Sequence, residues 1–101
     1  MSGTVSLIVN HADNELMAFL NGALVYDRKT EGNPGLNDQV QLQGLMQAGS
    51  NVLVLVGVNW GGPATFDGRI EASGNIVIPF SYTAASTPNG MCWNQTFNLT
   101  Y

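Results

Sequence analysis

Apolar and polar residues alternate with a period of two along much of this chain, and turn signals separate the alternating segments. Such alternation is typical of β-strands, whereas a helix needs apolar residues at a spacing near 3.6. No segment keeps helical spacing for three turns. The sequence therefore predicts an all-β chain of short antiparallel strands.

The strand boundaries follow from where the alternation starts and stops. Asn21-Gly22 is the dipeptide best suited to a type I′ hairpin turn, because both positions tolerate positive φ. Asn51–Asn59 is apolar on both faces, as expected of a central strand. The expected strands are Thr4–Asn10, Glu15–Leu20, Ala23–Arg28, Asp38–Met46, Asn51–Asn59, Thr65–Ala72, Asn75–Tyr82 and Gln95–Tyr101. About eight such strands predict an antiparallel β-sandwich of two packed sheets, with a jelly roll as one common closure.

Length and composition fit one domain over residues 1–101. The hydrophobic share of 45% predicts a packed core. Cys92 is the only cysteine, so it forms no intrachain disulfide and is expected to act as a small apolar residue. We expect the core to hold without covalent links.

The charge pattern excludes some partners. Only 10% of the residues are charged, and the cations Arg28, Lys29 and Arg69 form no basic stripe, so nucleic acid is not expected as a partner. The longest apolar run, Val52–Val58, is too short for membrane insertion. No Sec-type signal is visible in residues 1–14, so we expect cytoplasmic synthesis or non-classical export.

Two segments resemble a known group of domains. The run Ala12-Asp-Asn-Glu-Leu-Met-Ala-Phe-Leu-Asn-Gly22, followed by Gly49-Ser-Asn-Val-Leu-Val-Leu-Val-Gly-Val-Asn59, resembles the galactose-binding-like jelly rolls. These include carbohydrate-binding modules and the sugar-binding domain of family 2 β-galactosidases. The resemblance covers roughly half of the chain and implies a jelly-roll fold and a carbohydrate partner.

The resemblance carries over no ligand-binding residue, because the sugar contacts of that family lie on variable loops. Asn21-Gly22 is explained by the hairpin, and Asn51 by bonds to the local backbone before its strand. No cofactor is required, although calcium often steadies such modules. A calcium site needs several converging oxygen ligands, for which Asp13 and Asp38 are only scattered candidates.

Counting antiparallel strands assigns the connections to two ends of the molecule. Asn21-Gly22, residues 47–50 and Ser73-Gly74 fall at one end, and residues 10–14, 29–37, 60–63 and 83–94 fall at the other. The second end collects the candidate ligand-binding residues, which are His11, Asp13, Asn33, Asn37, Asp38, Trp60, Asn89 and Trp93.

These residue types suit a sugar, which needs an aromatic platform for its C–H face and amides or carboxylates for its hydroxyls. Trp60 or Trp93 is the candidate platform, and the competing interpretation is that each indole is a lid on the core. His11 is more often a turn residue than a ligand. Asp67 and Arg69, two apart on one strand, fit a solvated charged face.

Catalysis is not expected. Glycoside hydrolysis needs two framed carboxylates, and no such pair stands out among the seven acids. Cys92 would need a base, for which His11 is the only histidine. We therefore predict a non-catalytic, lectin-like carbohydrate-binding domain. The alternative is a structural β-sandwich subunit that binds no small molecule and assembles through its edge strands, and a homo-oligomer is compatible with either.

Overall fold

A computed structural model describes residues 3–32, 34–73 and 76–101. The expectation of an antiparallel all-β fold is confirmed, and the described residues contain no α-helix. The elements are β1 (Val5–Leu20), β2 (Ala23–Thr30), β3 (Asp38–Gln41), the 3₁₀ turn η1 (Gln43–Leu45), β4 (Ser50–Asn59), β5 (Ala64–Ala72), β6 (Ile76–Ala84) and β7 (Gly90–Thr100).

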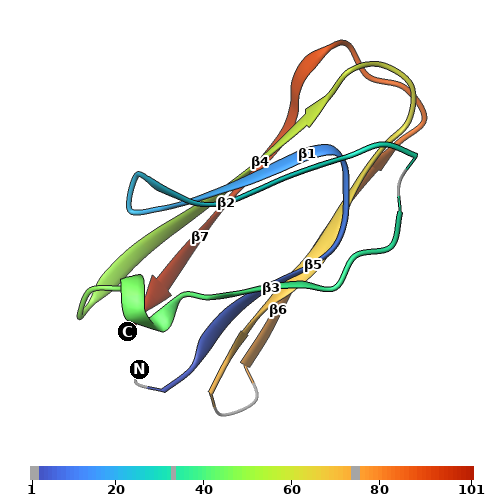
Figure 1. Ribbon diagram of the computed structural model, residues 1–101. Coiled ribbons are helices and arrows are strands. Elements are labelled where there is room, and N and C mark those ends of the chain that lie inside the picture. Colours follow the sequence, from blue (N-terminus) through green and yellow to red (C-terminus); the bar gives the residue numbers. More distant parts are fainter. Residues whose placement is uncertain (1–2, 33, 74–75) are drawn as a thin grey trace.

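Strand β1 is the centre of the sheet. The sheet order is β6-β5-β1-β4-β7, and β2 and β3 also pair with β1. Residues 6–9 of β1 lie between β3 and β5, whereas residues 15–20 lie between β2 and β4. Because β1 changes neighbours along its length, the sheet curls into a half-barrel with β4 and β7 facing β5 and β6 (Figure 1).

The continuity of β1 corrects one prediction. Two strands with a turn at residues 10–14 were expected, yet β1 runs through this segment with a bulge at Asn10, which is skipped in the pairing of Val9 and His11 with β5. Val9 on one side of the bulge and Ala12 on the other are both fully buried. The extra residue shifts the buried positions from odd to even numbers. In the sequence this break in the alternation has the same pattern as the end of one strand and the start of another.

The core lies between the two facing halves of the sheet. Phe66 of β5 stacks on Trp93 of β7 at a centroid distance of 5.8 Å and an interplanar angle of 8°. Phe80 of β6 lies 5.9 Å from the same indole. Gly57 of β4 makes room for this stack, because a Cβ atom there would lie 2.6 Å from the Phe66 ring. These aromatic contacts hold the two halves together.

Other boundaries differ from the expected ones. The strand expected over Asp38–Met46 ends at Gln41, which is opposite Ser6. Since β1 begins at Val5, there are no further residues of β1 to pair with, and the chain continues into η1. Strand β7 begins at Gly90, so the expected loop 83–94 is reduced to residues 85–89. Residues 90–94, which were expected to belong to that loop, are instead part of β7 and pair with β4 as far as Asn59.

The predicted hairpin at Asn21-Gly22 is confirmed. Asn21 has a φ of 51° and Gly22 a φ of 86°, as a type I′ turn requires. The predicted role of Asn51 is also confirmed, because its side chain bonds Gln47 and Gly49 of the preceding turn. Of the Ser73-Gly74 connection, Gly74 lies outside the described residues.

Candidate functional site

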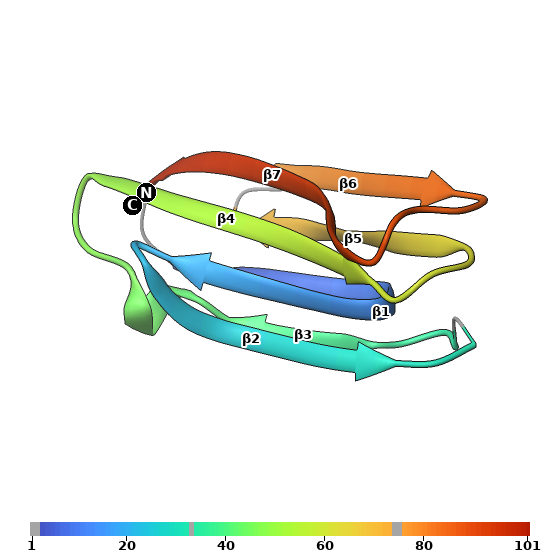
Figure 2. The same ribbon diagram turned by 90° about the horizontal axis from the view of Figure 1, so that it is seen from above.

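The connections that follow β2, β4 and β6 gather at one end of the molecule, opposite the chain termini (Figure 2). The bulged segment of β1 joins them, since the Leu36 backbone N–H donates to the Asn10 carbonyl at 2.7 Å. The buried Asn59 side chain donates to the Gly62 carbonyl at 2.9 Å and to the Thr87 hydroxyl at 2.7 Å. These bonds fix the loop that carries Trp60.

Trp60 is the exposed aromatic residue of this end, with 50% of its surface accessible. Its backbone N–H donates to Asn14 Oδ1 at 2.8 Å, and Asn14 Nδ2 donates to the Thr30 carbonyl at 3.3 Å. One side chain of β1 therefore connects the end of β4 to the end of β2. The backbone of Trp60 is thus held by a hydrogen bond, while half of the residue's surface is exposed to solvent.

Beside Trp60 lies an open groove of about 340 Å³ whose other walls are Lys29, Thr30 and Glu31. The lining residues thus carry an indole, an ammonium, a hydroxyl and a carboxylate. Lys29 Nζ lies 4.0 Å from Glu15 Oε2, and the Thr30 hydroxyl donates to the Ala12 carbonyl at 2.9 Å. The groove can bind the apolar face of a ligand and hydrogen-bond its hydroxyl groups.

Sequence reasoning missed Asn14, Lys29, Thr30 and Glu31 as site residues. A usable signal was present, because counting outward from the Asn21-Gly22 hairpin brings residue 30 opposite residue 13, next to Asn14. The structure shows this pairing, with Thr30 opposite both Asp13 and Asn14. The count does not predict the contact between Asn14 and Trp60, because these residues are 46 positions apart in the sequence.

Two further candidates keep exposed positions near the loops. The Asn89 Oδ1 atom lies against Gly61, so this amide is close to the loop that carries Trp60. Asn37 is exposed directly before β3. Asn33, also a candidate, lies outside the described residues.

Three polar candidates have partners within the protein or are buried. His11 Nδ1 lies 2.9 Å from Asp67 Oδ1, and both side chains are about one-third exposed. Asp38 accepts a 2.7 Å hydrogen bond from the Tyr26 hydroxyl and lies 3.3 Å from the Arg28 guanidinium. Asp13 is only 6% exposed, and burial raises the pKa of its carboxyl.

Trp93 does not lie in the loop where it was expected. It is part of β7 and is surrounded by the rings of Phe66, Phe80 and Tyr82, with the Tyr82 ring centred 6.1 Å away. The misplacement arises because the strand starts earlier than the alternation indicated. The partly buried indole packs against the core, which leaves Trp60 as the candidate platform.

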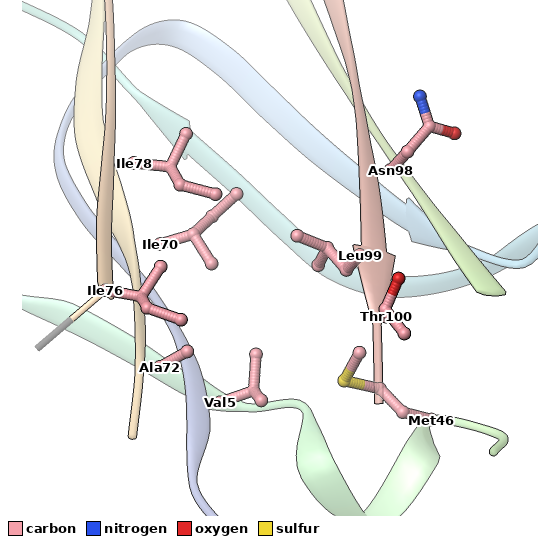
Figure 3. A pocket seen from close by; sticks show the side chains of 9 residues that line it. All are labelled: Val5, Met46, Ile70, Ala72, Ile76, Ile78, Asn98, Leu99 and Thr100. Atoms are coloured by element: carbon pink, nitrogen blue, oxygen red, sulfur yellow. The ribbon is translucent and has the colours of Figure 1, made fainter. Parts of the chain in front are cut away.

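A second cavity, of about 150 Å³, is lined in part by Val5 and Thr100, close to the two chain termini. Figure 3 shows Ile70, Ile76, Ile78 and Leu99 converging on it from β5, β6 and β7. The lining is almost wholly aliphatic and offers few partners for hydroxyl groups. The groove beside Trp60 is therefore the better candidate for a polar ligand.

The expected charged face on β5 is present. Asp67 faces His11, and Arg69 Nε lies 2.6 Å from Glu71 Oε2. Cys92 Sγ lies 3.6 Å from the Gly57 carbonyl, and burial raises the pKa of the thiol, so the reactive thiolate is disfavoured. His11, its candidate base, is engaged with Asp67.

Metal-ligating side chains do not cluster in the part of the chain that the structure describes, where no three His, Cys, Asp or Glu residues converge. Asp13 and Asp38 lie in separate surroundings, because Asp38 is held by β2 side chains while Asp13 lies between Thr30 and Thr65 in the β-ladders. The described residues also include no helix long and apolar enough to cross a membrane.

In comparisons with known proteins, no protein-family model, curated protein or solved structure matches this chain.

Proposed function

We propose that this chain is a non-catalytic carbohydrate-binding domain whose platform is Trp60. The observation that carries the proposal is the half-exposed Trp60, whose backbone is held by Asn14 and whose side chain lines a groove together with Lys29, Thr30 and Glu31. Covering the exposed apolar surface of a Trp with a ligand is favourable, because it removes that surface from water. Since polar groups lie beside Trp60, a ligand with both an apolar face and hydroxyl groups fits best. A pyranose ring has this character.

In the proposed complex the C–H face of a sugar ring stacks on the Trp60 indole. The Glu31 carboxylate accepts hydrogen bonds from ring hydroxyls, and the Lys29 ammonium donates to them. Because Asn14 and Asn59 hold the Trp60 loop in the free protein, little ordering entropy is lost on binding. The ligand is bound without a covalent step.

The finer fold that we propose is a two-layered β-sandwich of the galactose-binding-like, jelly-roll kind. Two observations support it. The resemblance of residues 12–22 and 49–59 to those domains is one, and the change of neighbours along β1, which sets β4 and β7 against β5 and β6, is the other. A curled sheet whose two sides share one aromatic core has the layered packing of a sandwich.

The test is a glycan array followed by titration calorimetry on Trp60→Ala. Loss of stacking and of the buried indole area should weaken binding by at least roughly tenfold. The melting temperature should stay near that of the wild type, because the indole is half exposed. Leu45→Ala is the matched control, since Leu45 is 57% exposed and lies on η1 outside the proposed site.

Trp93→Ala separates the two indoles. It should lower the free energy of unfolding by about 3 kcal/mol, near the lower end of the usual cost of truncating a buried Trp, because Trp93 is partly buried. A wild type that binds no glycan, or a Trp60→Ala variant that binds as tightly as the wild type, would reject the carbohydrate proposal. The alternative of a structural subunit would then remain, favoured by the absence of charged residues from β4, β6 and β7.

A further inference from the structure

Strand β4 carries two apolar rows, and only one of them faces the core. Leu53 and Leu55 are fully buried and belong to the core. Val52, Val54, Val56 and Val58 alternate with them and are exposed or half-buried. Among the described residues, the core and the apolar side chains packed against it include none of these four valines. The valine row therefore points away from the core.

Neighbouring strands widen this row into an apolar surface. In the β1–β4 register, Met17 is opposite Val56 and Phe19 is opposite Val54. Phe19 in turn is opposite Leu24 of β2, which is 53% exposed. We call this surface the valine face; it consists of Val52, Val54, Val56, Val58, Met17, Phe19 and Leu24. It is bordered on β7 by the exposed side chains of Asn94, Thr96 and Asn98.

The outer side of the other half of the sheet has a different chemistry. There His11 pairs with Asp67, Arg69 pairs with Glu71, and the Ser6 hydroxyl donates to Gln41 at 3.2 Å. By contrast, β4 and β7 contain no charged residue. One outer side is therefore built for water and the other resembles an interface, although both belong to a single sheet.

A second copy of this chain fits the valine face in size. The valine face and its β7 border together span four strands, which at a spacing of about 4.8 Å and over on the order of 25 Å of strand give roughly 500 Å² per copy. Two copies packed face to face would bury roughly 1,000 Å², which is the lower limit for a specific interface. The expected dimer is therefore weak, and it dissociates on dilution.

Charge also fits a second copy. The charged residues beside the valine face, Glu15, Asp27 and Lys29, lie along the half of it that holds Val56 and Val58, since Asp27 is opposite Met17 and Glu15 is opposite Val58, and Lys29 approaches Glu15. A two-fold axis in the plane of the interface and perpendicular to the strands sets this half against the uncharged end near Leu20 and Leu53 of the partner copy. The valine rows then meet each other with no charge between them.

We propose that the valine face is the interface of a homodimer in which two copies pack their outer β1–β4 surfaces face to face. This interface is isologous, so it closes with two copies. The sheets lie about 10 Å apart, as in sheet-on-sheet packing, and the valine side chains of the two copies interdigitate.

Sedimentation velocity over a wide range of protein concentrations tests the proposal. The wild type should shift from monomer to dimer as its concentration rises. Val54→Lys places a charge in the centre of the valine face and should stay monomeric throughout. Ser81→Lys, an equal change of charge at an exposed position opposite Asp67 on the other outer side, should dimerise like the wild type. Circular dichroism verifies that both variants are folded.

A milder variant guards against loss of folding. Val54→Thr keeps the shape of the side chain and should weaken the dimer severalfold without unfolding the chain. Mixed isotope labelling should give intermolecular contacts between valine methyl groups. A wild type that remains monomeric, a Val54→Lys variant that still dimerises, or intermolecular contacts confined to the β7 edge would each overturn the proposal. Glycan binding by Val54→Lys should equal that of the wild type, so the two proposals fail independently.

Discussion

The Asn51 side chain shows how a single residue can organise one end of this molecule. It is 1% exposed, and its Oδ1 accepts from the Gln47 backbone N–H and from Asn21 Nδ2, both at 2.9 Å. Its Nδ2 donates to the carbonyls of Gln47 and Gly49. Asn51→Ala should lower the free energy of unfolding by about 2–4 kcal/mol, because it removes the four hydrogen bonds of a buried side chain that holds the turn in place. Urea denaturation measures the loss. Asn94→Ala, at an exposed position of β7, is the control and should change stability by less than about 0.5 kcal/mol. Equal losses in the two variants would show that the Asn51 bonds do not hold this end.

At the scale of elements, β2 and β3 are joined by side chains across the curl of the sheet. The Tyr26 hydroxyl donates to Asp38, and burial, followed by that bond, raises the pKa of Tyr26 well above its ordinary value near 10. The folded state then keeps a proton that the unfolded state loses, so this contribution is complete below about pH 10 and is lost as pH rises further. Tyr26→Phe should cost about 1.5–3 kcal/mol at neutral pH, the usual worth of a bond to a charged group. The difference between the variant and the wild type should shrink above about pH 10. Urea denaturation at several pH values checks this, and a difference that grows with pH would contradict it.

The elements also show what a sequence can predict. The Asn21-Gly22 hairpin and the two apolar rows of β4 depend on local conformation and on side-chain period, and both were predicted from the sequence. Residues 10–14 were not, because a polar cluster with a change of phase is compatible with either a turn or a bulge. The choice is made by β5, whose Asp67 pairs with His11 across 56 positions of the chain. The site follows the same rule. Trp60 was a candidate by residue type, but the position of its loop depends on Asn14, and the packing of Trp93 against the core depends on Phe66 and Phe80.

At the scale of the whole molecule, the shared strand β1 makes the two halves of the sheet depend on each other. Leu7 of β1 pairs with β3 and β5, while Leu55 of β4 pairs with the later part of β1, and both are fully buried. Leu7→Ala and Leu55→Ala should each lower the free energy of unfolding by about 2–5 kcal/mol. More importantly, each should shift one common transition, because neither half keeps its ladder or its aromatic core without β1. A Trp60→Phe background makes Trp93 the only indole, so its fluorescence reports on the contact between the halves and far-UV circular dichroism reports on the strands. The two signals should change at the same urea concentration in both variants. If Leu55→Ala lost the Trp93 signal while half of the β-signal survived, the halves would be independent units and β1 would not couple them.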